Sequence, residues 1–109
     1  MANKQVMKAK GMRLEEVVDY QKGSVVSREI INKQTATVTV FAFDKGQGLS
    51  EHVAPFDVFV YILNGEAKIF ILSKPHLLKK GEMIIMPANK PHALKAVRKF
   101  KMLLVMIRS

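Results

Sequence analysis

Three histidines, His52, His76 and His92, are the side chains of this 109-residue chain best suited to chemistry near neutral pH. A neutral imidazole carries one hydrogen-bond donor and one acceptor, titrates near physiological pH and is a common metal ligand. The chain contains no cysteine, which excludes disulfides, thiolate metal sites and cysteine nucleophiles. The sequence shows no serine paired with a base and no phosphate-cradling loop, so nucleophilic catalysis is not expected.

Two of the histidines lie in glycine-framed segments. Gly46 is followed by five residues and then His52, and Gly65 closes this first segment. His92 lies in a second segment that begins at Gly81. His76 instead follows the turn predicted at residues 73–75, and we expect it to face solvent.

Short strands must position these histidines, because apolar residues recur with the two-residue period of a sheet and almost nowhere with helical spacing. Asn64-Gly65 is a strong hairpin signal. The pattern predicts an all-β, antiparallel sandwich or barrel. The strands are predicted at residues 25–31, 35–43, 58–63, 66–71, 83–86, 91–97 and 100–107.

Residues 1–24 are predicted to form an N-terminal arm, and residues 25–109 a single barrel domain. The strands at 58–63 and 103–107 are apolar on both faces, so something must cover their outer side. Either the arm or a second subunit can do so. We expect a homodimer that pairs sheets back to back.

The two histidine segments together resemble the motifs of the cupin superfamily, whose members fold as a double-stranded β-helix, or jelly-roll barrel. In the first motif His52 stands at the position of the first histidine. In the second, Asn89 replaces a glycine and Ala96 replaces the final asparagine; asparagine tolerates the left-handed backbone that a tight turn needs. The matching positions are Gly46, His52, Gly65, Gly81, Pro87 and His92.

The resemblance also implies a metal-ligand set, which this chain has largely lost. The four ligand positions of metal-binding cupins correspond here to His52, Ala54, Val58 and His92. The nearest carboxylate, Asp57, is one residue early, which turns it to the opposite strand face unless a bulge intervenes. With Asp57 as a third ligand, His52 and His92 could hold Fe, Mn, Ni or Zn, but the sequence requires no cofactor.

The alternative use of the two histidines is to bind a small molecule or move a proton within an apolar cavity. Four methionines, Met83, Met86, Met102 and Met106, are interpreted as core filler. The side chains expected to point inward are Val38, Val40, Val58, Val60, Ile62, Leu94, Met102 and Met106.

The formal charge of +9 raises the question of nucleic-acid binding. No recognition helix or aromatic stacking platform accompanies the lysines, so we interpret them as a solvating surface and expect no nucleic-acid partner. The apolar runs are too short for a membrane span, and the N-terminal residues lack the apolar core of a secretory signal. A cytoplasmic location is the expectation.

Three functional hypotheses follow. The first is a metal-free barrel that binds an unidentified small molecule around His52 and His92. The second is a metal-dependent oxidoreductase or isomerase with a reduced ligand set. The third is a structural or regulatory protein whose barrel is filled by side chains. Whether the protein is an enzyme, and on which substrate, stays open.

Overall fold

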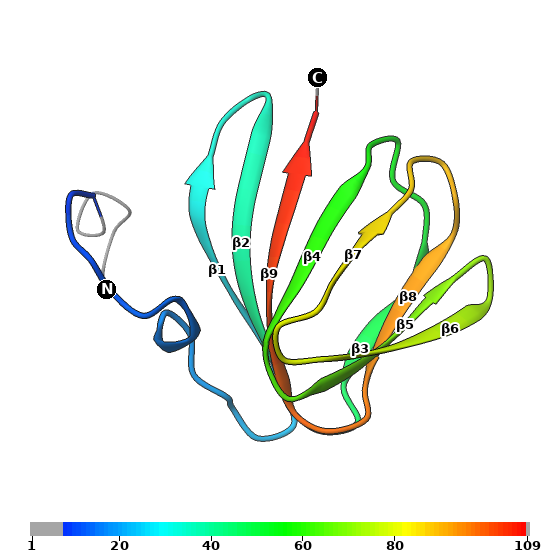
Figure 1. Ribbon diagram of the computed structural model, residues 1–109, viewed down its shortest axis with the longest axis horizontal. Coiled ribbons are helices and arrows are strands. Elements are labelled where there is room, and N and C mark those ends of the chain that lie inside the picture. Colours follow the sequence, from blue (N-terminus) through cyan, green and yellow to red (C-terminus); the bar gives the residue numbers. More distant parts are fainter. Residues whose placement is uncertain (1–7, 109) are drawn as a thin grey trace.

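The computed structural model describes residues 8–108, which form an antiparallel all-β barrel with an N-terminal arm (Figure 1). A short 3-10 helix, η2 (Leu14–Glu16), lies in the arm. The strands are β1 (Val25–Asn32), β2 (Ala36–Phe43), β3 (Gly48–His52), β4 (Val58–Asn64), β5 (Glu66–Ile71), β6 (Lys74–Lys79), β7 (Met83–Met86), β8 (His92–Ala96) and β9 (Phe100–Ile107).

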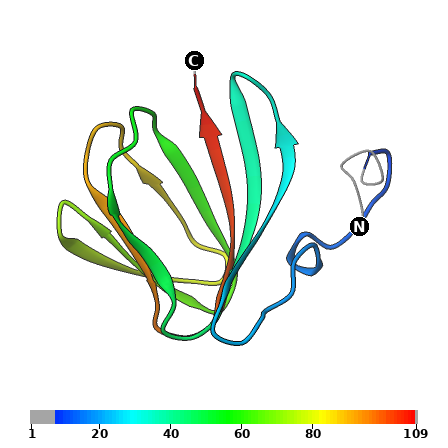
Figure 2. The ribbon, with the colours of Figure 1, turned by 180° about the vertical axis from the view of Figure 1, so that it is seen from behind.

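The strands form two sheets that face each other. The five-stranded sheet has the order β1-β2-β9-β4-β7, and the four-stranded sheet has the order β3-β8-β5-β6. Views from both sides show the sheets converging where β8 turns into β9 and diverging toward the β3–β4 and β7–β8 loops (Figure 2). The predicted double-stranded β-helix is therefore confirmed, and its diverging end is the barrel mouth.

The barrel interior is a single apolar core. Phe43 and Phe100 are fully buried and stack with ring centroids 4.4 Å apart and planes 8° from parallel. Offset aromatic stacking adds about 0.5–1.5 kcal/mol to the burial of two such rings. The other buried members of this core are Ala54, Val58, Val60, Ile62, Ala67, Ile69, Leu78, Met86, Leu94, Ala96 and Met102.

The arm packs across part of the outer face of the five-stranded sheet. Val17 and Val18 are buried there against Val40, Ala42 and Leu63. Polar contacts hold the arm in place as well. The Lys101 ammonium donates to the carbonyl oxygen of Glu15 at 2.5 Å, and the Arg28 guanidinium donates to that of Val17 at 3.2 Å.

The side chains of β2 face the opposite way from the prediction. Val40 was expected to point inward, but it packs beneath the arm, and Phe41 and Phe43 face the barrel core instead. Val38, two residues before Val40, shares its outward face. Both faces of β2 are apolar, so alternation alone did not distinguish inside from outside.

Strands β3 and β6 were not predicted from the sequence. Both are edge strands of the four-stranded sheet, and most of their residues are exposed. Neither therefore shows the apolar alternation of a half-buried strand. The turn expected at 73–75 is shifted: Leu72 and Ser73 have positive φ, and Lys74 already belongs to β6.

Candidate functional site

An irregularity in β3 brings His52 opposite His92. Leu49 pairs with Leu94, and His52 pairs with His92, so β3 has one more residue than β8 over the same stretch. Without this bulge, the three-residue separation of Leu49 and His52 would place them on opposite faces. The bulge therefore turns His52 toward the histidine on the neighbouring strand.

The two imidazoles meet edge to face at the barrel mouth. Their Nε2 atoms are 3.0 Å apart, their ring centroids are 4.3 Å apart, and their planes are inclined by 76°. His92 is only 1% exposed, whereas His52 is exposed. In this pair the His92 ring is buried, and it contacts a His52 ring that is exposed to solvent.

Backbone carbonyl groups fix the tautomer of both rings. His52 Nδ1 lies 2.7 Å from the carbonyl oxygen of Ser50, and His92 Nδ1 lies 3.2 Å from that of Lys90. A carbonyl oxygen only accepts hydrogen bonds, so each Nδ1 carries a proton and donates it. In neutral rings of this tautomer both Nε2 atoms present lone pairs. Two acceptors at 3.0 Å repel each other unless a proton bridges them, supplied by one of the rings or by a bound donor, or unless a cation binds both.

Burial makes His92 a poor source of a proton between the two Nε2 atoms. Burial lowers the pKa of His92, and the nearby His52 lowers it further, while the hydrogen bond to the Lys90 carbonyl acts in the opposite direction. His92 is therefore held in its neutral form at neutral pH. When neither ring supplies the proton between the two Nε2 atoms, a group from outside the chain can donate it.

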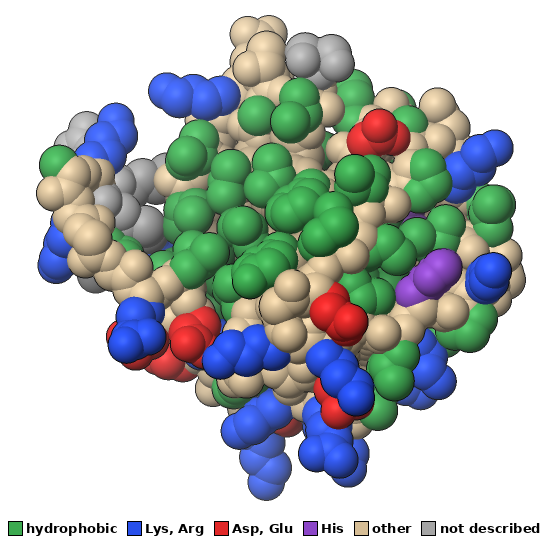
Figure 3. All heavy atoms as spheres, viewed as in Figure 1, with side chains coloured by type: hydrophobic (Ala, Val, Ile, Leu, Met, Phe, Trp, Pro, Cys, Tyr) green, Lys and Arg blue, Asp and Glu red, His purple; other side chains and the backbone are tan. Residues whose placement is uncertain are grey.

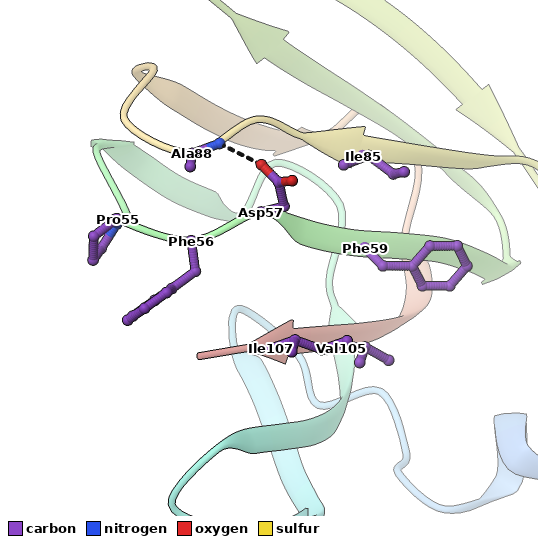
Figure 4. Close-up of a pocket in the computed structure, with 8 residues that line it drawn as sticks. All are labelled: Pro55, Phe56, Asp57, Phe59, Ile85, Ala88, Val105 and Ile107. Carbon is purple, nitrogen blue, oxygen red and sulfur yellow. Dashed lines mark hydrogen bonds between the residues drawn. The ribbon is translucent and has the colours of Figure 1, made fainter. Parts of the chain in front are cut away.

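The other two ligand positions carry apolar side chains that are part of the barrel core. Ala54 and Val58 are buried in that core. Asp57 faces the other way, as the one-residue offset predicts. Its carboxylate accepts a hydrogen bond from the Ala88 backbone N–H at 2.8 Å and lines a hollow on the outer side of the five-stranded sheet (Figure 4).

The donor set therefore does not fit a tightly held metal ion. Among residues 8–108, no three side chains of His, Cys, Asp or Glu lie close enough to hold one. Two imidazoles fall short of the three protein ligands that catalytic zinc or non-haem iron sites use. The structure does not bring Asp57, the third candidate ligand, to His52 and His92.

His76 lies apart from the pair. It is half-buried rather than fully exposed, and it pairs with Ile69 across β5 and β6. Ile69 belongs to the barrel core, so His76 lies at its margin rather than wholly in solvent. Sequence reasoning did not anticipate the backbone contacts at Ser50 and Lys90, since they depend on the β3 bulge and on the turn before β8.

The turn before β8 also links the loops of the mouth. Asn89 has φ of 64°, which confirms the left-handed position predicted for it. Its backbone N–H donates to the carbonyl oxygen of Ala54 at 2.7 Å, next to the Asp57–Ala88 bond. The β3–β4 loop and the β7–β8 loop are therefore joined by two hydrogen bonds.

Comparison with solved structures finds close likenesses. A conserved protein of unknown function from Streptococcus pyogenes is 40% identical, with a TM-score of 0.89 over 93% of this chain and 89% of that one. A cupin 2 conserved barrel domain protein from Leptotrichia buccalis is 42% identical, with a TM-score of 0.85; the match covers 88% of this chain but 47% of that one. A cupin superfamily protein from Desulfitobacterium hafniense shares the fold, with a TM-score of 0.89 at 24% identity over 94% of each chain.

Sequence comparison identifies the family. No curated protein sequence matches the chain. The family model of the cupin domain matches residues 39–108, which include both histidines and all strands from β3 to β9. No helix in the described part of the chain is long and apolar enough to span a membrane. With the barrel topology, the family match and the relative at 40% identity, the chain belongs to the cupin family.

Proposed function

We propose that this cupin barrel binds a small molecule that donates a hydrogen bond, from an O–H or N–H group, to the Nε2 atoms of His52 and His92. The observation that carries the proposal is the 3.0 Å approach of these two atoms while both Nδ1 atoms face carbonyl oxygens. An ionised carboxylate offers acceptors only, so it does not match this pair. An alcohol, a phenol or an amide N–H does.

The surroundings of the pair favour a ligand with an apolar body. Val53 follows His52 directly and is exposed, as is Leu72 at the tip of the β5–β6 hairpin. The Leu72 backbone N–H donates to the carbonyl oxygen of Pro91, the neighbour of His92, at 2.9 Å. Exposed apolar residues therefore follow both chain positions that pair with His92, namely His52 on β3 and Ile71 on β5. Because His52 is the exposed ring, the ligand approaches from its side.

We further propose that the barrel holds no tightly bound metal at this pair. The support is the donor set itself: alanine and valine at two ligand positions, and Asp57 turned outward. Metal analysis of protein purified without a histidine tag tests this proposal. Stoichiometric iron, manganese, nickel or zinc would overturn it and favour the alternative, a metal-dependent oxidoreductase or isomerase.

Nitrogen NMR of the imidazoles tests the binding proposal with phenol and its methyl ether, anisole, as probes. The two probes share an aromatic body, but only phenol carries an O–H donor. At a pH where both rings are neutral, we expect two Nδ1–H tautomers in the free protein. Phenol should shift both Nε2 resonances in a saturable way, and anisole should leave them in place.

Two variants serve as controls for the NMR test. His52→Leu should abolish the phenol response at His92, whereas His76→Gln should leave it unchanged, because His76 lies outside the pair. An Nε2–H tautomer on both rings would overturn the proposal. Equal responses to phenol and anisole would also overturn it, since they would show that the donor is irrelevant.

A further inference from the structure

Two lysines face each other across the four-stranded sheet, on the side that points away from the barrel core. Lys68 on β5 is directly opposite Lys95 on β8. The residues before and after each lysine are buried in the core, so strand alternation turns both lysines outward. Among residues 8–108, no carboxylate forms an ion pair with either of them. Because like charges directly opposite each other destabilise a sheet, this lysine pair costs the fold stability.

Apolar residues lie beside the lysine pair on the same outer surface. Lys68 is opposite Leu77 of β6, which is 53% exposed. One row closer to the barrel mouth, Phe70 is opposite Ala93 and Pro75. Phe70 is half-buried, and both of these neighbours are small. The outer surface of the sheet therefore combines two unpaired cations with an apolar area. We call the six residues the lysine face: Lys68, Lys95, Leu77, Phe70, Ala93 and Pro75.

Glu66, the acidic residue of β5, does not neutralise the lysine pair. It lies one row closer to the converging end of the barrel, opposite Lys79 of β6. Its Oε1 atom is 3.9 Å from Nε of Arg98. Glu66 therefore has two cationic neighbours of its own, and the charge of the lysine pair is left for a group from outside the chain.

Further cations gather where the two sheets converge. Hydrogen bonds from the backbone N–H groups of Gly23 and Lys45 lower the pKa of the Asp44 carboxyl, and the nearby ammonium groups of Lys99 and Lys22 lower it as well. The space-filling view shows Lys and Arg side chains crowded at this end of the barrel, at the bottom of Figure 3. The lysine face thus borders a surface that attracts anions.

We infer that the lysine face docks an acidic segment of a partner protein, in which carboxylates are interspersed with aliphatic side chains. Carboxylates placed between Lys68 and Lys95 relieve the repulsion that the fold otherwise tolerates. Aliphatic side chains of the same segment cover Leu77 and Phe70. The formal charge of +9 steers such an acidic partner toward the protein.

The apolar part of the lysine face favours a polypeptide over a nucleic acid strand. A single strand binds by stacking successive bases on aromatic rings. Phe70 is the one aromatic residue of the lysine face, whereas Leu77, Ala93 and Pro75 offer aliphatic surface on which bases do not stack. Aliphatic side chains of a protein segment bury this surface and gain from its removal from water.

Fluorescence anisotropy with the labelled peptide EELEELEE tests the inference at about 50 mM salt, where screening is weak. The wild-type protein should bind this peptide in a saturable way. The peptide EESEESEE keeps the carboxylates and lacks the leucines, so it should bind at least about 5-fold more weakly. Leu77→Ser should weaken the leucine peptide and leave the serine peptide unchanged.

Lys95→Glu turns the like-charged pair into an oppositely charged one. It replaces an attraction for the peptide with a repulsion, so EELEELEE should bind at least about 10-fold more weakly. The same variant should resist urea at least as well as the wild type, because the repulsion across β5 and β8 is removed. A lysine that only solvates the surface would leave peptide binding unchanged.

Lys33→Glu is the matched control. It makes the same change in net charge at an exposed position between β1 and β2 of the other sheet, so it should change peptide binding by less than about 2-fold. Circular dichroism should show all variants folded. Wild-type protein that does not bind EELEELEE at up to about 1 mM would overturn the inference. Equal losses in Lys33→Glu and Lys95→Glu, or a lower urea midpoint in Lys95→Glu, would do so as well. Tighter binding of an oligothymidylate than of the peptide would overturn it in favour of a nucleic acid.

Discussion

The contact between Lys101 and the arm yields a prediction whose size can be worked out. Lys101 is 9% exposed, its ammonium donates to the Glu15 carbonyl at 2.5 Å, and it lies 5.0 Å from the centre of the Tyr20 ring. A hydrogen bond to a charged group contributes about 1.5–3 kcal/mol, and a cation–π contact about 0.5–1 kcal/mol. Desolvation of the buried ammonium offsets part of this sum.

Lys101→Met keeps most of the apolar stem and removes the charge. We expect arm docking to weaken by about 1–3 kcal/mol, which corresponds to a 5- to 150-fold larger population of undocked arm. Tyr20 keeps its second cation–π contact, since the Lys99 ammonium lies 4.7 Å from the ring centre. The barrel core should keep its stability, because none of these contacts reaches it.

Native-state hydrogen exchange measures this effect residue by residue. The amides of Glu16 and Val17, bonded to the carbonyls of Arg13 and Leu14, should exchange faster by the same factor. The amide of Ile69, in the centre of β5, should not change. Lys95→Met removes the same charge at an exposed position and serves as the control. Unchanged exchange in the arm, or equal acceleration in both variants, would refute the reasoning.

Three further predictions concern the pair, the core and a turn. Because burial lowers the pKa of His92, the unfolded chain binds a proton below about pH 6.5 that the folded state resists, so stability is full above this pH and falls below it. Urea unfolding at about pH 7 and pH 5 measures this loss of stability, which His92→Gln should reduce and His76→Gln should not. An unchanged difference in unfolding free energy between the two pH values in His92→Gln would contradict the prediction. Phe100→Ala should cost about 3–5 kcal/mol in the same assay, and a cost below about 1 kcal/mol would show that the Phe43 stack is not tightly packed. Gly65→Ala should destabilise by more than about 1 kcal/mol, because φ is +78° and the new Cβ would lie 1.9 Å from the Lys99 carbonyl oxygen; a neutral effect would mean that the β8–β9 turn moves freely.

Much of the barrel could be predicted from the sequence. The central strands β4, β5, β8 and β9 carry enough apolar residues to reveal their period. Asn64-Gly65 marked the hairpin that joins β4 to β5. The edge strands β3 and β6 were missed, because an edge position leaves one side unpaired and needs few apolar side chains.

The sequence singled out the two histidines that the structure brings together, but not the geometry of the pair, and their role as a binding site stays a prediction. The motif spacing singled out His52 and His92, and strand parity correctly turned Asp57 away from Val58. The bulge in β3 could not be predicted, because an extra residue on one strand is recognised only when the residue pairing with the neighbouring strand is known. The carbonyl contacts that set both tautomers depend on that bulge and the turn before β8. The homodimer, the ligand and the cytoplasmic location stay predictions.

The two hydrogen bonds between the mouth loops limit how the barrel can open. Ala54 and Asp57 on one loop are tied to Asn89 and Ala88 on the other, so neither loop swings outward without breaking both ties or taking its neighbour along. The two loops of the mouth therefore move together, as one unit, and not independently of each other. Because His52 is exposed at the surface, a ligand can reach the pair without breaking either hydrogen bond.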